Sequence, residues 1–198
     1  MKVFFSPASP YVRKVMAIAV ETGQEVEKLD SAASPVNRDG RIVAKNPTGK
    51  VPTAILDDGE ALYDSRVICR WLDDQHGGAK MYPAAPALWT VLRREALADG
   101  LLDAALLARY ETVMRPAEML WPDWLRGQFE KIDSSLDQME AEAAGFSGVD
   151  AGLIAIGCAV GYLDFRFADR PWRDGRPALA GWYETFSARP SMRETAPD

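Results

Sequence analysis

Residues 3–14 read Val-Phe-Phe-Ser-Pro-Ala-Ser-Pro-Tyr-Val-Arg-Lys. The apolar run at residues 3–5 predicts a short buried strand, and the helical spacing after Pro10 predicts a helix that ends at Gly23. Serine is a favoured N-cap and proline a favoured first helical residue, so Ser9 is expected at the junction. Helix starts attract negative charge. Ser9 is therefore either a cap alone or a cap that also donates a hydrogen bond to a bound anion, including a thiolate.

The rest of residues 1–80 alternates between strand and helix patterns. We expect a strand over 26–29, a loop with a short helix ending near 44, a strand over 51–56, a hairpin turn at 57–60, a return strand at 61–63, and a helix from 66 to 75 that Asp64 and Ser65 cap. The order is β-α-β-α-β-β-α, which is an α/β fold. Its first three elements predict a βαβ unit with a parallel strand pair.

Pro52 lies near the start of the strand predicted over residues 51–56. Proline cannot donate to a sheet ladder, so it belongs at the start of a strand or on an edge. If the Val51–Pro52 bond is cis, the bend leaves the N–H and C=O of Val51 unpaired and facing outward. Those groups would then pair with a peptide-like ligand as an added strand. The alternative is an ordinary trans proline at a sheet edge.

The second part of the chain shows only helical periods. A linker with two prolines occupies residues 81–86 and separates an α/β domain (1–80) from an all-helical domain (87–198). Helices are expected over 87–114 and 122–144, from a capping box at Ser147–Asp150 onward, and from Pro177 until Arg189-Pro190. The third of these is apolar on nearly every side between residues 151 and 161, which predicts the central helix of a bundle.

Composition restricts the class of protein. Apolar residues make up 47% of the 198 residues, enough for a packed core, and no apolar run approaches a membrane span or a secretory signal. The net charge is −6, residues 1–80 are neutral, and no basic stripe is visible, which disfavours nucleic acid as a partner. Cys69 and Cys158 lie in apolar helical patterns and are interpreted as buried thiols of a cytoplasmic protein. A single histidine, His76, excludes a multi-histidine metal site, and no metal is expected.

Four segments together resemble the glutathione S-transferase superfamily, and the similarity covers nearly the whole chain. They are Ser9-Pro10-Tyr11-Val12-Arg13-Lys14, Asn46-Pro47-Thr48-Gly49-Lys50-Val51-Pro52, the pair Asp64-Ser65, and residues 147–163 with Ser147 and Asp150 as the capping box. The first resembles the start of serine-type classes, so the chain resembles a bacterial serine-type member. The resemblance implies a thioredoxin-like N-terminal domain (β-α-β-α-β-β-α) and an all-α C-terminal bundle.

The resemblance also implies a glutathione site in the first domain, with glutathione as co-substrate. The backbone of Val51, before a cis Pro52, would pair with the cysteinyl backbone. Ser65, with its N–H at a helix start, would hold the γ-glutamyl carboxylate, and Asp64 would face the γ-glutamyl ammonium group. Lys50 would either bind the glycyl carboxylate or remain a solvated loop lysine.

The sulfur of glutathione is expected at Ser9, with Ser6 on the same loop as the rival donor. A free thiol has a pKa of about 8.5, and a charge-assisted hydrogen bond with a helix dipole lowers it by roughly one or two units. The resulting thiolate would attack an electrophilic, hydrophobic substrate or reduce a peroxide. A cysteine at this position would favour thiol–disulfide exchange instead. A non-catalytic glutathione-binding or protein-interaction module of the same fold is the alternative function.

The second substrate, a small electrophile, is expected between the domains. Tyr11, Tyr110, Met114 and Trp121 are candidates for the lining of an apolar pocket, or else residues of the core or of a dimer interface. Tyr11 departs from the phenylalanine usual after Ser-Pro in these classes and adds a hydroxyl near the helix start. The resemblance further implies a homodimer, and detoxification as the role of the enzyme.

Overall fold

The computed structural model describes residues 1–197, and the contacts between residues divide the chain into two units. The first unit comprises residues 1–88 together with the segment from Pro190 onward, and the second unit comprises Trp89–Arg189. The domain limits predicted from the sequence stay a prediction. The contacts differ from them in one respect, because the C-terminal segment packs with the first unit.

The first unit contains a mixed four-stranded sheet in the order β2-β1-β3-β4. Its strands are β1 (Lys2–Phe5), β2 (Glu27–Asp30), β3 (Thr53–Ile55) and β4 (Ala61–Leu62). β2 pairs parallel to β1, whereas β3 pairs antiparallel to both β1 and β4. The parallel pair predicted from the sequence is confirmed. The strand predicted over residues 51–56 is shorter than expected and starts only after Pro52, which has no N–H for the ladder.

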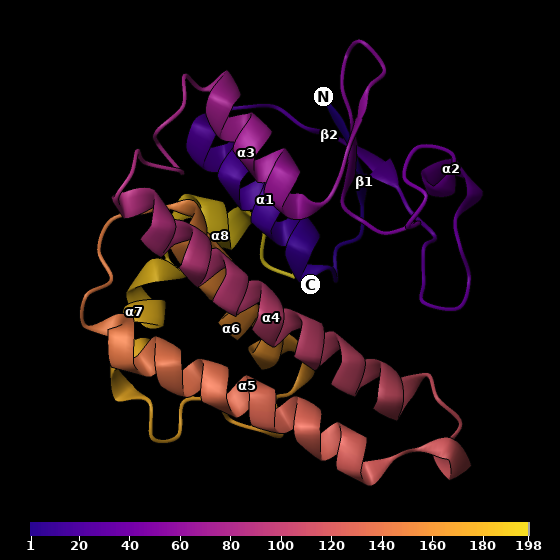
Figure 1. Cartoon of the computed structure of the whole chain (residues 1–198), viewed down its shortest axis with the longest axis vertical. Helices are drawn as coiled ribbons and strands as arrows, with labels where there is room; N and C mark the ends of the chain where they lie inside the picture. The colour runs from indigo at the N-terminus through magenta and orange to yellow at the C-terminus, as the bar shows by residue number, and fades with distance from the viewer. Residues whose placement is uncertain (198) are drawn as a thin grey trace. The chain divides into compact units, whose positions relative to one another are not determined.

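Three helices accompany the sheet, namely α1 (Pro10–Thr22), α2 (Gly40–Val43) and α3 (Ser65–Gln75). Figure 1 shows α1 and α3 side by side, and they pack closely. Val15 and Ile18 of α1 and Ile68 and Leu72 of α3 are fully buried. Gly23 ends α1 as predicted, with φ 71° and its N–H donating to carbonyls of the last turn. The predicted order β-α-β-α-β-β-α is therefore confirmed.

A short C-terminal helix, α8 (Pro190–Glu194), completes the first unit. The sequence predicted that Arg189-Pro190 ends a helix, and it did not predict a new one. Two hydrogen bonds, one part-buried and one buried, hold α8 on α1. Ser191 Oγ donates to Glu21 Oε1 at 2.6 Å, and Arg13 Nη2 donates to the Met192 carbonyl at 3.0 Å.

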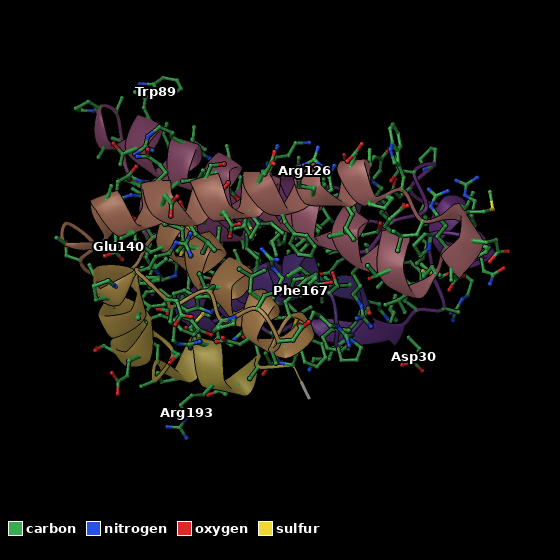
Figure 2. All side chains as sticks on the ribbon, turned by 90° about the horizontal axis from the view of Figure 1, so that it is seen from below. Asp30, Trp89, Arg126, Glu140, Phe167 and Arg193 are labelled. Atoms are coloured by element: carbon green, nitrogen blue, oxygen red, sulfur yellow. The ribbon has the colours of Figure 1, made fainter. Side chains whose placement is uncertain are left out.

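The second unit is helical. Its elements are α4 (Ala87–Val113), which begins in the first unit, a 3₁₀ turn η1 (Ala117–Met119), α5 (Pro122–Ala143), α6 (Ala151–Arg166) and α7 (Pro177–Phe186). Residues 151–163 of α6 are all buried, so the prediction of a central helix is confirmed. In Figure 1, α6 lies behind the long helices α4 and α5. Trp89 is 66% exposed, and Figure 2 shows it pointing away from the ribbon of α4.

The start of α6 differs from the prediction. Asp150 is the N-cap, and its Oδ1 accepts a hydrogen bond from Leu153 N at 2.8 Å. Ser147 is exposed and does not cap the helix, because the chain passes Gly148 in a left-handed conformation (φ 70°) and α6 starts only at Ala151. The Ser147–Asp150 capping box was therefore wrong, whereas the structural role of Asp150 as a cap is confirmed. Burial raises the pKa of Asp150.

Candidate functional site

The sheet register brings the predicted glutathione-site residues of the first unit to one end of the sheet. Phe4 of β1 pairs with Thr53 at the start of β3, and Ala54 of β3 pairs with Leu62 at the end of β4. The loop after β1, the segment before β3 and the segment after β4 therefore meet at that end, where α1 and α3 also begin. The predicted residues at this end are Ser6, Ser9, Lys50, Val51, Pro52, Asp64 and Ser65.

Ser9 is the N-cap of α1. It has an extended backbone (φ −84°, ψ 118°), and its Oγ accepts a hydrogen bond from Val12 N at 3.3 Å. Its own N–H donates to the Ser6 carbonyl at 3.1 Å, which closes the loop between β1 and α1. Because Oγ acts as an acceptor toward the helix, the hydroxyl hydrogen stays available to donate. The side chain is half-buried, so a ligand at the helix start can reach it.

Ser6 lies directly after β1 and is also half-buried. Its carbonyl belongs to the loop closure with Ser9, while its hydroxyl makes no hydrogen bond within the described chain. Both serines therefore have a hydroxyl that can donate at the same end of the sheet. The choice between them stays a prediction, and the helix cap favours Ser9 because its oxygen is fixed by the Val12 N–H.

The segment before β3 is held by Asn46, for which the sequence predicted no role beyond its place in the motif at residues 46–52. Asn46 is 2% exposed, and its Nδ2 donates to Thr53 Oγ1 at 2.8 Å. Its Oδ1 accepts from Thr48 N at 3.0 Å and from Thr48 Oγ1 at 2.8 Å. Thr53 Oγ1 in turn donates to the Lys50 carbonyl at 2.8 Å. One buried amide thus fixes both ends of the turn that presents Lys50 and Val51.

Val51 and Pro52 follow this turn. The Val51–Pro52 peptide bond is cis, as the resemblance implied, and Pro52 is buried. Within residues 1–197 neither the N–H nor the C=O of Val51 has a hydrogen-bond partner. Val51 is half-exposed, so both groups are available to the backbone of a ligand. Lys50 is exposed, and its ammonium group makes no ion pair among the described residues.

Asp64 and Ser65 form the start of α3. Asp64 is the N-cap, with Oδ1 accepting from Arg66 N at 3.0 Å, and its second carboxylate oxygen remains open at this exposed position. Ser65 is the first residue of the helix and is 3% exposed. N–H groups in the first turn of a helix have no intrahelical acceptor, so they bind anions readily. The predicted cap is confirmed for Asp64, whereas Ser65, which was predicted to share in the cap, is the first residue of the helix.

The residues predicted for the second substrate belong to different units. Tyr11 is half-buried in the first unit. Tyr110 on α4 is half-buried in the second unit, and burial raises the pKa of its phenol. Met114 is 40% exposed and Trp121 is 61% exposed. Their membership in one pocket stays a prediction.

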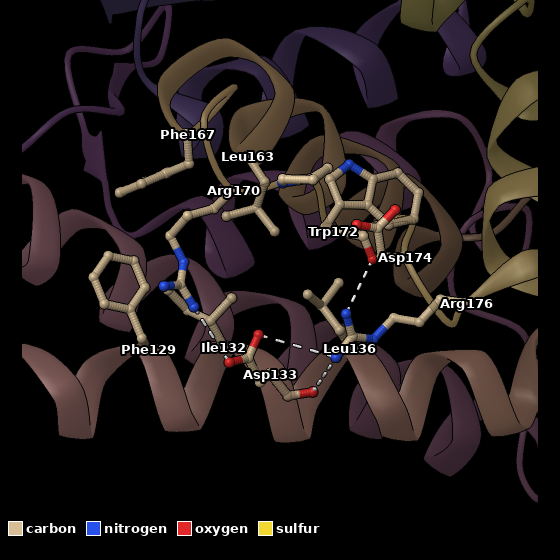
Figure 3. Close-up of a pocket in the computed structure, with 11 residues that line it drawn as sticks. Phe129, Ile132, Asp133, Leu136, Leu163, Phe167, Arg170, Trp172, Asp174 and Arg176 are labelled. Carbon is tan, nitrogen blue, oxygen red and sulfur yellow. Dashed lines mark hydrogen bonds and ion pairs between the residues drawn. The ribbon is translucent and has the colours of Figure 1, made fainter.

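Figure 3 shows a pocket inside the second unit, with a volume of about 270 Å³. Ile132, Leu136 and Leu163 form its apolar floor. Arg170 and Arg176 at its rim both lie within ion-pair distance of Asp133. Because these charges satisfy one another, the pocket holds no unpaired guanidinium for a ligand, and we assign it no function.

Comparisons with known proteins agree with this architecture. The glutathione S-transferase N-terminal domain model matches residues 3–80, and the C-terminal domain model matches residues 122–185. The GST-like protein YibF of Escherichia coli is 36% identical over 100% of this chain and 98% of its own length. A crystal structure of a glutathione transferase family member from Pseudomonas fluorescens, with bound glutathione, is 46% identical with a TM-score of 0.94 and covers 100% of this chain and 98% of the other. A second, with bound S-(propanoic acid)-glutathione, is 47% identical with a TM-score of 0.92 and covers 100% of both.

A thioredoxin-like domain followed by a helical domain is the architecture of glutathione S-transferases. The chain belongs to the glutathione S-transferase family. Among the described helices, none has both the length and the hydropathy that crossing a bilayer requires. Within residues 1–197, no three His, Cys, Asp or Glu side chains form a cluster suited to a metal ion.

Proposed function

We propose that this protein is a serine-type glutathione transferase in which the Ser9 hydroxyl stabilises the thiolate of bound glutathione. The observation that carries the proposal is the geometry of Ser9, whose oxygen is fixed at the start of α1 by the Val12 N–H while its hydrogen stays available to donate. Ser6 is the alternative donor. The bound structures of the Pseudomonas fluorescens relative, with glutathione and with S-(propanoic acid)-glutathione, support glutathione as the ligand.

The tripeptide would bind along the end of the sheet. The free N–H and C=O of Val51 would pair with the cysteinyl backbone, and Pro52 would fix the start of β3 beneath it. The first turn of α3, at Ser65, would hold the γ-glutamyl carboxylate, and the open oxygen of Asp64 would face the ammonium group. Lys50 would bind the glycyl carboxylate. Each charged group of glutathione thus meets a group of opposite charge or a donor.

The chemical step needs a thiolate rather than an added base. The thiol proton of bound glutathione leaves to solvent, and Ser9 donates to the sulfur anion near the positive end of the α1 dipole. A charge-assisted hydrogen bond of about 1.5–3 kcal/mol corresponds to a fall in thiol pKa of roughly one to two units. With an aryl chloride, the sulfur then forms a C–S bond while the C–Cl bond breaks, and chloride leaves with the electron pair.

Peroxide reduction is the second reaction open to the same thiolate. The sulfur attacks one peroxide oxygen, and the O–O bond breaks to release an alcohol. The resulting sulfenyl group of glutathione reacts with a second glutathione, which gives oxidised glutathione and water. Two thiols are oxidised for each peroxide reduced.

The electrophile is proposed to be hydrophobic, and its pocket would be lined by Tyr11, Tyr110, Met114 and Trp121. The enzyme would act in the cytoplasm, in detoxification, as a homodimer. The alternative function is that of a non-catalytic glutathione-binding or protein-interaction module. Such a module would keep the binding groups at the starts of α3 and β3 but would not need the Ser9 hydroxyl.

Two measurements on the purified chain separate these functions. Retention on immobilised glutathione with elution by free glutathione tests binding, and conjugation of 1-chloro-2,4-dinitrobenzene tests transfer. The proposal predicts both, with conjugation lost in large part in Ser9→Ala. Retention without conjugation of any electrophile or reduction of cumene hydroperoxide would support the binding module. Failure of retention and of turnover would contradict both functions.

A further inference from the structure

The C-terminal end of the chain returns to the first unit and packs on α1. α8 follows the whole second unit in sequence, yet it belongs to the first unit and lies beside α1 (Figure 1). Ser191 and Met192 of α8 are both buried. The Ser191 hydroxyl donates to Glu21 in the last turn of α1, and the Met192 carbonyl accepts from Arg13 at the end of the first turn. α8 thus holds α1 at two points, one of which lies at the end that carries Ser9.

Arg13 connects α8 to the Ser9 cap. The backbone N–H of Arg13 donates to the Ser9 carbonyl at 3.0 Å, and this hydrogen bond closes the first turn of α1. The side chain belongs to a residue that is only 8% exposed, and its Nη2 donates to the Met192 carbonyl at 3.0 Å. Two hydrogen bonds therefore lead from the end of the chain to the residue that is proposed to stabilise the thiolate.

The Arg13 guanidinium is buried without a compensating acid. Within residues 1–197 it forms no ion pair with a carboxylate, and its Nε is buried without a hydrogen-bond partner. Burial of a cation costs free energy that a single carbonyl offsets only in part. An apolar side chain would pack α8 on α1 at a lower cost. What the guanidinium adds is a directed contact with one atom of α8, so its role is to fix a position.

The Ser9 hydroxyl depends on the placement of this first turn. Its Oγ is held by one hydrogen bond, from Val12 N at 3.3 Å, which is longer than is usual for such bonds. A donor that stabilises an anion must lie about 3 Å from it, and a displacement of roughly 1 Å removes much of the effect. The local cap leaves the turn room to shift, and the contact of Arg13 with α8 restrains the turn from outside the helix.

We propose that Arg13 is a positioning residue whose hydrogen bond to the Met192 carbonyl holds the first turn of α1, and with it the Ser9 hydroxyl, where that hydroxyl meets the sulfur of glutathione. This role rests on the proposed function of Ser9. It makes α8, at the opposite end of the chain, a part that thiolate stabilisation requires. The bond between Ser191 and Glu21 lies at the far end of α1, roughly 18 Å from Ser9 at a rise of about 1.5 Å per residue, and has no such role.

The test measures the thiol pKa of bound glutathione in the full-length wild type, Arg13→Met, Ser9→Ala and the double variant. The ultraviolet absorbance of the thiolate, followed against pH, reports this pKa. Arg13→Met keeps an unbranched side chain but has no donor, so the bound-thiol pKa should rise by about half a unit or more. In the Ser9→Ala background the same change should add nothing, because Arg13 acts through the Ser9 hydroxyl. Equal rises in both backgrounds would show a direct effect of the Arg13 charge on the sulfur and would overturn the positioning role.

Ser191→Ala is the matched control, because it removes the other hydrogen bond between α8 and α1. Urea unfolding should show that both variants are less stable than the wild type, whereas only Arg13→Met changes the bound-thiol pKa. A rise of the same size in Ser191→Ala would overturn the specific role of Arg13. If Arg13→Met does not fold, Arg13→Lys takes its place, because it keeps the charge and loses the fork. It should raise the bound-thiol pKa by a smaller amount, and only where Ser9 is present.

A thioether of glutathione separates this role from general support of the binding site. S-Methylglutathione has no thiol to ionise, so calorimetry should find its Kd in Arg13→Met within about twofold of the wild-type value. A Kd that rises about tenfold would show that Arg13 supports the whole site and would overturn its role at Ser9. A bound-thiol pKa that rises in Ser9→Ala but not in Arg13→Met would overturn the role of Arg13 and leave the proposed function intact. A pKa that is unchanged in Ser9→Ala would contradict the proposed function, and the role of Arg13 with it.

Discussion

The Glu142 carboxylate on α5 accepts two hydrogen bonds from the Arg93 guanidinium on α4, one at each oxygen, both at 2.7 Å. Gln138 Nε2 donates to Glu142 Oε1 at 2.7 Å. The Glu142 side chain is only 17% exposed. The Arg93 hydrogen bonds are the largest cause that lowers the pKa of Glu142, from 4.5 to about 2. This carboxylate therefore links the two longest helices of the second unit.

The first prediction concerns the acid dependence of stability. The folded-state pKa of Glu142 lies below its unfolded value, so its contribution is present above about pH 4.5 and disappears as the pH falls toward about 2. Glu142→Gln should reduce the free energy of unfolding near pH 7, and the difference from the wild type should shrink below about pH 4.5. Urea unfolding at several pH values measures this difference in the free energy of unfolding. Glu130→Gln, which removes an exposed partner of Arg126 on the same helix, should change little at any pH.

A second prediction concerns the close approach of α6 to α4. A Cβ added at Gly152 would lie 2.8 Å from both Arg94 Cβ and the Val91 carbonyl oxygen. Neither atom is the end of a flexible side chain, so Gly152→Ala should force the helices apart and cost about 1–3 kcal/mol of unfolding free energy. Gly127→Ala on α5 is the control, because nothing lies within 4 Å of its added Cβ. It should stabilise the protein by about 1 kcal/mol, and equal effects of the two changes would count against the packing argument.

A third prediction concerns the segment that follows α3. Asp73 is 1% exposed, and its carboxylate accepts hydrogen bonds from the backbone N–H groups of Lys80, Met81 and Tyr82 at 3.1, 2.7 and 3.1 Å. Asp73→Ala leaves these donors without their acceptor, so thermal or urea unfolding should show a loss of about 3 kcal/mol or more. Asp74→Ala, at the exposed neighbour, should stay within about 0.5 kcal/mol of the wild type. A mild effect at Asp73 would mean that water replaces the carboxylate.

The fourth prediction concerns Asn46 and the turn that presents Val51. Asn46→Ala removes the buried bridge to Thr48 and Thr53, so the Val51 backbone should lose its fixed position. We expect KM for glutathione to rise about tenfold, with a smaller change in kcat, because binding rather than sulfur activation is affected. Steady-state kinetics with varied glutathione measure this split. Asn37→Ala, at an exposed loop position, should leave both constants unchanged.

Local signals in the sequence predicted much of the first unit. Ser9-Pro10 and Gly23 identified the two ends of α1, and the order of strands and helices along the chain followed from the alternating patterns. The signals failed where tertiary contacts decide the structure. α8 depends on the bonds of Ser191 and Met192 to α1, which no local pattern encodes.

In the candidate site, too, local patterns predicted some features, and tertiary contacts decided the others. The helix starts at Ser9 and Asp64 follow from capping preferences that are visible in the sequence. Asn46 was overlooked because its role arises from the folding of a turn back onto Thr53, although its place in the quoted motif was a usable signal.

The most direct test of the central claim is the pKa of the thiol of glutathione while it is bound to the protein. The ultraviolet absorbance of the thiolate, followed against pH, reports it for the wild type and for Ser9→Ala, with Ser6→Ala as the matched control. We predict a bound-thiol pKa below the free value of about 8.5, a rise of about one unit or more in Ser9→Ala, and no comparable rise in Ser6→Ala. A bound-thiol pKa that stays the same in Ser9→Ala would contradict the role of this hydroxyl.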